Sequence, residues 1–134
     1  MQKTIKVFSY LFIGLSILSL GSVSILSMFH PQATMDLVHV QLSNNDAISS
    51  IRGVYGGVGL VIVISLIFLL INNRRQALGF LTMFWGFYAL SRLITIAADG
   101  PLGAFGNQWI VIETVFFLLG LSLRLLSGRS LNKA

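Results

Sequence analysis

Four long apolar segments constrain the fold of this 134-residue chain more than any other feature. They cover residues 7–29, 51–71, 77–97 and 109–126, and each is close to the roughly 17–25 residues that cross a hydrocarbon core as a helix. Single strands of that composition would leave backbone groups unpaired in lipid, and the chain is too short to close a sizeable barrel. The sequence therefore predicts an all-α, polytopic membrane protein, a four-helix transmembrane bundle forming one domain over residues 1–134.

The composition agrees with a membrane protein and disfavours a soluble one. Charged residues make up 10% of the chain, whereas soluble domains carry about 25%. Parallel strands of a soluble protein are the rival interpretation for the Val- and Ile-rich residues 58–67, but that apolar run is long for a strand. The absence of cysteine excludes a disulfide framework and a thiolate site. The sequence predicts no metal and no other cofactor.

The distribution of charge predicts which way the segments cross the membrane. The formal net charge is +5, but the cations form short clusters between apolar runs, which favours a membrane over a nucleic acid. Seven of the nine basic residues fall on one side of the predicted bundle: Lys3, Lys6, Arg74, Arg75, Arg124, Arg129 and Lys133. The acidic residues collect toward the other side: Asp36, Asp46, Asp99 and Glu113. The positive-inside rule then predicts that both termini are cytoplasmic.

The first apolar segment follows a charged start that is also typical of a signal peptide. Its 23 residues exceed the usual 7–15-residue apolar region of such peptides, and no Ala-x-Ala site precedes His30 and Pro31. We expect a retained first span, with cleavage as the alternative.

Arg52, Arg92 and Glu113 are the charges that fall in or beside the predicted spans on the external side. Arg92 lies five residues before the end of the third segment, or roughly 7 Å deep at 1.5 Å per residue. Glu113 enters the fourth segment from the same side at nearly the same depth. Because charges in lipid are costly and commonly pair, we expect Arg92 and Glu113 to form an ion pair, with Arg52 above it.

Aromatic residues share helical faces with these three charges. The candidate ligand-binding residues are Arg52, Tyr55, Trp85, Tyr88, Arg92, Trp109 and Glu113. One interpretation is a pocket with a charged mouth and an apolar floor, suited to an amphipathic molecule or a lipid headgroup. The other is that the ion pair pins two helices together while the aromatic residues fill the core.

The glycines of the second segment predict close helix packing. Residues 53–59 lack the Lys-Ser/Thr ending of a P-loop and the dinucleotide-binding spacing. Gly53 and Gly57 form a small-xxx-small pair, and the Gly- and Ser-rich first segment is the expected partner. We expect the serines of that segment to bond back to their own helix.

The external connections carry cap and turn signals. Asn44 and its neighbours are N-cap candidates for the second segment, and Asn107 is one for the fourth. Residues 99–101 predict a turn, and the glycine-rich residues 102–107 predict a hinge. The longer connection over residues 30–43 is expected to lie on the membrane surface, either as an interfacial loop or as a lid.

Several short motifs of the sequence resemble those of a known family. They are Ser49-Ser-Ile-Arg52-Gly-Val-Tyr-Gly56-Gly57, Ser91-Arg92-Leu-Ile-Thr95 followed by Asp99-Gly100-Pro101, and Glu113. The chain resembles, over most of its length, the bacterial membrane proteins of domain of unknown function 4345. The resemblance implies a small four-helix inner-membrane protein and implies no activity. Ser91 stands where the family often has glycine.

Three functions are compatible with these features. The first is a non-catalytic protein whose outer-leaflet site binds a lipid-like or small anionic ligand, or docks a membrane partner or a second copy. The second is a membrane-embedded enzyme acting on an apolar or lipid substrate, with Glu113 as the catalytic general acid or base. The third is a transporter that would need to oligomerise. The sequence leaves open whether the protein is an enzyme.

Overall fold

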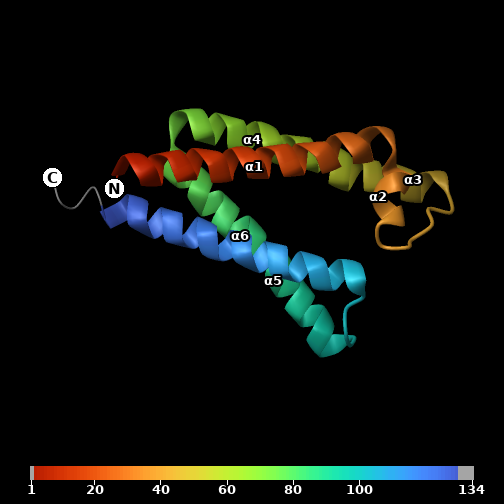
Figure 1. Cartoon of the computed structure of the whole chain (residues 1–134). Helices are drawn as coiled ribbons and strands as arrows, with labels where there is room; N and C mark the ends of the chain where they lie inside the picture. The colour runs from red at the N-terminus through yellow and green to blue at the C-terminus, as the bar shows by residue number, and fades with distance from the viewer. Residues whose placement is uncertain (1, 130–134) are drawn as a thin grey trace. The chain divides into compact units, whose positions relative to one another are not determined.

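The computed structural model describes residues 2–129 and confirms the all-α prediction for them (Figure 1). The elements in chain order are α1 (Gln2–Phe29), α2 (Pro31–Asp36), α3 (Asn45–Ile51), η1 (Arg52–Val58), α4 (Gly59–Asn72), α5 (Arg74–Ala98) and α6 (Ala104–Arg129). The segment η1 is π-helical, and it joins α3 to α4 without a break, so that Asn45–Asn72 is one long helix.

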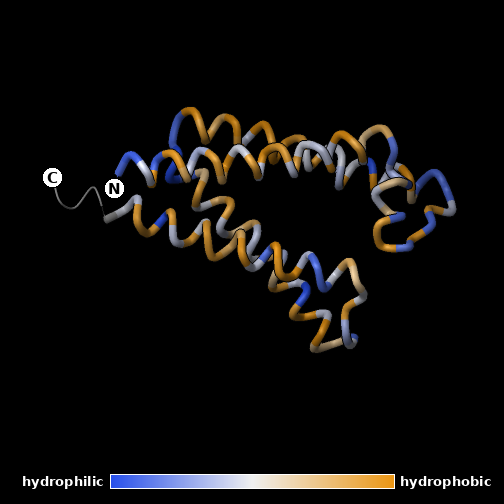
Figure 2. Tube along the Cα trace, in the orientation of Figure 1, coloured by the Kyte–Doolittle hydropathy of each residue, from blue (hydrophilic) through white to orange (hydrophobic). Residues whose placement is uncertain are grey.

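Four helices are long and apolar enough to cross a membrane: Gln2–Phe29, Asn45–Asn72, Arg74–Ala98 and Ala104–Gly128. Figure 2 shows hydrophobic residues following one another along these helices, while the connection through α2 and α3 is more hydrophilic. Large apolar side chains remain uncovered on them, such as Leu18 (72% exposed) and Ile71 (77% exposed). Such surfaces suit lipid as the solvent, so the chain is a multi-pass membrane protein by helix length and hydropathy.

The helix ends confirm one predicted cap and correct another. The side chain of Asn44 caps α3 by accepting a hydrogen bond from the backbone nitrogen of Ala47 at 2.8 Å. Asn107 is no cap, because α6 begins at Ala104 and the side-chain amide of Asn107 instead donates to the carbonyl of Leu102 at 2.9 Å. The predicted hinge over residues 102–107 is accordingly helical from Ala104 onward.

The chain forms two compact units. One comprises residues 14–69 and is called the 14–69 unit. The other comprises residues 1–13 and 70–134 and is called the hairpin unit, because α5 and α6 form its antiparallel hairpin. The single-domain assignment over residues 1–134 stays a prediction.

In the 14–69 unit, glycine allows α1 to approach the second long helix closely. A Cβ atom added to Gly56 would lie 2.9 Å from the Cα atom of Met28, and one added to Gly59 would lie 3.0 Å from the Cβ atom of Ser24. A Cβ atom at Gly53 or Gly57 would meet nothing within 4 Å. The predicted partner helix is therefore correct, but the predicted glycine pair is wrong.

The serines of α1 behave as expected of hydroxyls in an apolar helix. Ser9, Ser24 and Ser27 each donate to the backbone carbonyl four residues earlier, at 2.7–2.8 Å. Ser22 donates to the carbonyl of Ser19 at 2.8 Å. Helix α1 thus satisfies the hydroxyl groups of these four serines with its own carbonyls, which lowers the free-energy cost of placing them in lipid.

The connection after α1 is folded rather than open. Pro31 begins α2, where its missing N–H is not needed. Gln32 then ties down the following turn, since its side chain accepts a hydrogen bond from the backbone nitrogen of Leu42 at 2.9 Å and donates one to the carbonyl of Val40 at 3.0 Å. The location of the connection over residues 30–43 at a membrane surface stays a prediction.

In the hairpin unit, small residues bring α5 and α6 together. A Cβ atom added to Gly86 on α5 would lie 2.9 Å from the ring of Phe117 on α6. A Cβ atom added to Gly120 on α6 would lie 3.0 Å from the hydroxyl of Thr82 and 3.3 Å from the ring of Phe12. Close packing at Gly86 and Gly120 holds α5 and α6 near each other, so that charged side chains on the two helices can meet.

Candidate functional site

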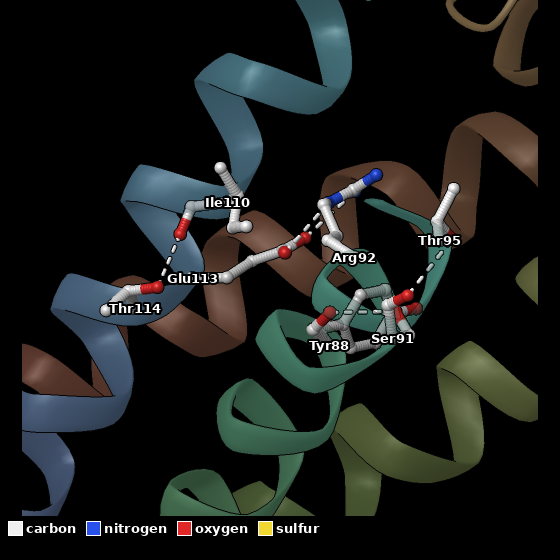
Figure 3. A network of polar contacts seen from close by, with 7 residues as sticks. All are labelled: Tyr88, Ser91, Arg92, Thr95, Ile110, Glu113 and Thr114. Atoms are coloured by element: carbon white, nitrogen blue, oxygen red, sulfur yellow. Dashed lines mark hydrogen bonds and ion pairs between the residues drawn. The ribbon is translucent and has the colours of Figure 1, made fainter. Parts of the chain in front are cut away.

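Arg92 on α5 and Glu113 on α6 form the predicted ion pair (Figure 3). The guanidinium Nε donates to Oε2 of Glu113 at 2.9 Å, and Nη2 donates to Oε1 at 2.9 Å. These two parallel bonds are the fork geometry in which arginine and carboxylate interact most strongly. The two helices are therefore joined by a charge-assisted contact near their connected ends.

The two partners differ in exposure. The side chain of Glu113 is 2% exposed, whereas that of Arg92 is 21% exposed. Both carboxylate oxygens are used by the pair, while Nη1 of Arg92 takes part in neither bond. The arrangement thus buries the anion and leaves one edge of the cation directed away from it.

Phe105 borders the ion pair and was missed by the sequence interpretation, which placed it in a hinge. Its ring centroid lies 5.8 Å from Cζ of Arg92, within cation–π range. It also contacts Trp109, with ring centroids 5.9 Å apart. The sequence held a usable signal: extending the last helix back by one turn places Phe105 on the face of Trp109 and Glu113.

The predicted aromatic residues of α5 pack in the hairpin unit. Trp85 is 3% exposed, and its ring centroid lies 5.0 Å from that of Phe116 on α6. Tyr88 is 40% exposed and contacts the ring of Phe84 at 4.9 Å. Trp85 therefore belongs to the core between α5 and α6, and Tyr88 lies at its edge. Their assignment to a ligand site stays a prediction.

Hydroxyl groups around the ion pair bond to their own helices (Figure 3). On α5, Ser91 donates to the carbonyl of Tyr88 at 2.7 Å and Thr95 donates to the carbonyl of Ser91 at 3.0 Å. On α6, Thr114 donates to the carbonyl of Ile110 at 2.7 Å. None of these three bonds involves Arg92 or Glu113.

Arg52 and Tyr55, the remaining predicted site residues, lie in η1 of the 14–69 unit. Nε of Arg52 donates to the backbone carbonyl of Met28 at 2.9 Å. That carbonyl lies near the end of α1, where carbonyls lack intrahelical donors, so Arg52 caps the helix. Tyr55 is 38% exposed. The placement of these two residues beside Arg92 stays a prediction.

Replacing Phe105 with leucine is expected to lower the free energy of unfolding by about 1 kcal/mol, because the ring face over the Arg92 guanidinium is lost. Thermal unfolding in detergent measures the change. The matched control is Phe87→Leu on α5, whose side chain is 68% exposed. In a double-mutant cycle with Arg92→Met, the two changes should be non-additive by about 0.5–1 kcal/mol. Strict additivity would show that the ring and the guanidinium do not interact.

The fold and the ion pair define a class of protein: a small multi-pass membrane protein with a buried intramembrane salt bridge. A protein-family comparison identifies the family more closely. The family described as "Domain of unknown function (DUF4345)" matches residues 8–124, so the chain belongs to this family. No curated protein and no solved structure matches the chain.

Proposed function

We propose that this chain is a non-catalytic protein of the bacterial inner membrane that binds a lipid-like or small anionic molecule at Arg92, beneath the outer surface of the bilayer. The observation that carries the proposal is the asymmetry of the ion pair. Glu113 is buried with both oxygens engaged, whereas Arg92 is partly exposed and keeps Nη1 outside the pair. A guanidinium held in this way is a pre-oriented donor for an anionic group.

The surroundings of Arg92 favour an amphipathic ligand. Phe105 and Trp109 provide apolar ring surface on the α6 side. We include Tyr88, Trp85 and the two residues of η1, Arg52 and Tyr55, in the proposed site on the sequence pattern alone. An anionic headgroup at Arg92 with an apolar body against the rings matches the usual division of such sites into few polar and many apolar contacts.

The positions of the basic residues support the proposed sidedness. Lys3, Lys6 and Arg74 come from two separate helices and line one cavity of the hairpin unit. Arg92 lies about 27 Å farther along α5 than Arg74, at 1.5 Å per residue. The hydrocarbon core is about 30 Å thick. With the basic end cytoplasmic, as the positive-inside rule expects, both termini are cytoplasmic and Arg92 lies near the outer boundary.

The enzyme alternative, with Glu113 as a general acid or base, is less well supported. Proton transfer needs a carboxylate oxygen within reach of the substrate. Here both oxygens already accept hydrogen bonds from Arg92, and the side chain is 2% exposed. A substrate would have to displace Arg92 before Glu113 could act, whereas a ligand for Arg92 needs no such rearrangement.

Mass spectrometry of molecules that copurify with the full chain tests the proposal. The sharpest comparison is between wild type and the double variant Arg92→Met/Glu113→Leu, because apolar replacement of both partners of a buried pair often preserves the fold. We expect an anionic lipid or small molecule on the wild type and about tenfold less on the double variant, since a charge-assisted hydrogen bond contributes about 1.5–3 kcal/mol. Equal amounts on both proteins would refute the site, and a copurifying protein lost in the same way would identify a docked partner instead.

A further inference from the structure

A cavity at the basic end of the hairpin unit has no role in the function proposed above. Its volume is about 200 Å³. The polar lining comes from Gln2, Lys3 and Lys6 on α1, Arg74 on α5 and Ser127 on α6. The cavity therefore lies where the first turns of two long helices meet the last turns of a third, at the ends of three candidate membrane spans.

The charge of this lining is entirely positive. Three of the lining residues are Lys or Arg, and none of the four acidic side chains of the chain belongs to the lining. Two more cations reach across the hairpin nearby: the guanidinium of Arg124 lies beside Gly79 of α5, and that of Arg75 lies beside Gly128 of α6. The positive dipole ends of α1 and α5 point to the same region, where they outnumber the one negative dipole end, that of α6. Such a field attracts an anion.

Two buried donors in this region lack partners among the described residues. They are Nη1 of Arg74 and the hydroxyl of Ser127, and both residues line the cavity. The guanidinium of Arg74 lies 5.7 Å from the ring centroid of Tyr10, which holds the side chain in position. A buried donor without an acceptor destabilises a protein, and the loss is larger when the donor is charged. Because both residues line the cavity, a ligand there whose acceptor oxygens reached these donors would satisfy both of them.

The size and the lining of the cavity narrow the range of ligands that it can hold. A volume of about 200 Å³ is below the roughly 300–1,000 Å³ of pockets that enclose drug-sized molecules. It therefore suits a single phosphate group rather than a whole nucleotide. Ile5 and Leu126 supply apolar lining beside the charged groups. A phosphate attached to an apolar body is the chemistry of a phospholipid, and basic pockets between the ends of transmembrane helices are typical headgroup sites.

We propose that Lys3, Lys6, Arg74 and Ser127 bind the phosphate of an anionic phospholipid headgroup. Arg74 and Ser127 donate hydrogen bonds to the phosphate oxygens, and the two lysines supply positive charge. The acyl chains lie outside the cavity, against the apolar surface of the hairpin unit. This site is separate from Arg92, so it holds whether or not the outer site binds a ligand.

Native mass spectrometry of the delipidated full chain in neutral detergent tests the site. The probes are phosphatidylglycerol, phosphatidylcholine and inorganic phosphate. We expect phosphatidylglycerol to occupy one site at a lower concentration than phosphatidylcholine does. Arg74→Gln should weaken phosphatidylglycerol binding at least about fivefold, the effect of ~1 kcal/mol for one basic residue near an anionic lipid. Arg124→Gln removes the same charge from the same end without lining the cavity, and it should leave binding within twofold of wild type.

Ser127→Ala provides a second readout that does not depend on the stability of Arg74 variants. Without lipid this variant should be at least as stable as wild type, because it removes an unpartnered buried hydroxyl. With phosphatidylglycerol it should gain less in melting temperature than wild type does, since stabilisation by a ligand follows its affinity. The opposite directions of the two effects distinguish a ligand contact from a packing role.

The outcomes separate the sources of the phosphate. Saturable stabilisation by phosphatidylglycerol alone supports a lipid headgroup, and equal stabilisation by inorganic phosphate supports a free anion bound by the same residues. Equal weakening by Arg74→Gln and Arg124→Gln would overturn the proposal, because binding would then reflect net charge alone. No preference for phosphatidylglycerol over phosphatidylcholine would overturn it as well.

Discussion

Replacing Glu113 with glutamine is expected to lower the free energy of unfolding by about 3–5 kcal/mol, the usual loss when one partner of a buried ion pair is removed. For a chain of this length the melting temperature in detergent should fall by roughly 10–20 °C. This is the largest effect that we expect from a single isosteric change. Thermal unfolding followed by circular dichroism or tryptophan fluorescence measures it.

The size of this effect follows from the burial of the pair. Glutamine keeps the shape of Glu113, but it presents an amide nitrogen to one of the two guanidinium donors, which is a donor facing a donor. Arg92 then carries an uncompensated charge at a depth where water solvates it poorly. The side chain of Arg92 is 21% exposed, so it can extend toward water and recover part of the lost solvation of its charge.

Two comparison variants identify the cause of the loss. Asp99→Asn removes an exposed acid from the same end of α5 and should change stability by no more than about 0.5 kcal/mol. Arg92→Met/Glu113→Leu removes both charges and should recover most of the stability lost in Glu113→Gln. If Glu113→Gln melted within the scatter of wild type, the ion pair would not hold α5 and α6 together.

The same variants divide the structural role of the pair from a ligand role. If the pair serves only to join the helices, the double variant should retain the same copurifying molecules as wild type. Under the proposed function it stays folded yet loses the copurifying molecule. A single Glu113→Gln change cannot separate these cases, because unfolding alone would release a ligand.

The sequence was enough to locate the ion pair, because the depth of a residue in a membrane helix follows from the number of residues between it and the end of the apolar segment. Arg92 and Glu113 lie at similar distances from the same end of adjacent apolar segments, and unpaired charges are costly there. The count needs only the rise of a helix and the position of a segment boundary. The predicted pairing is correct even though α6 begins at Ala104, earlier than the sequence predicted, because Arg92 and Glu113 still meet on facing helices.

The contacts that sequence reasoning missed depend on details that a residue pattern does not carry. Phe105 was assigned to a hinge because flanking glycines are typical of loops. In the structure α6 begins at Ala104, so Phe105 and Gly106 are both helical. The basic cavity unites residues from three segments that are far apart in the sequence. Its cations were assigned to one side of the membrane, but only coordinates show that they surround a common space.

The glycine-rich residues 53–59 offered more than one possible contact pair, and the sequence interpretation took the wrong one. Gly53 and Gly57 are four residues apart, whereas Gly56 and Gly59, the glycines that meet α1, are three residues apart. The π-helical turns of η1 change the angular position of each residue relative to an α-helix. A helical projection that assumes an α-helix therefore cannot decide which glycines meet α1.

Replacing Gly56 with alanine is expected to destabilise the 14–69 unit by about 1–3 kcal/mol, because the new methyl group overpacks a close helix contact. The added Cβ atom would lie 2.9 Å from both the nitrogen and the Cα atom of Met28. These are backbone atoms, so no side-chain rotation can relieve the clash, and α1 itself must move. That movement would also stretch the 2.9 Å bond from Arg52 to the carbonyl of Met28.

The neighbouring glycine supplies a matched control for this substitution. Gly57→Ala adds the same methyl group one residue later, where nothing lies within 4 Å. It should be neutral or stabilise the helix by up to about 1 kcal/mol, the difference in helix propensity between glycine and alanine. Thermal unfolding of both variants in the same detergent gives the comparison, and the signs of the two changes are expected to differ. Equal effects at the two positions would mean that α1 contacts a different face of η1, and would return Gly53 and Gly57 to consideration as the contact pair.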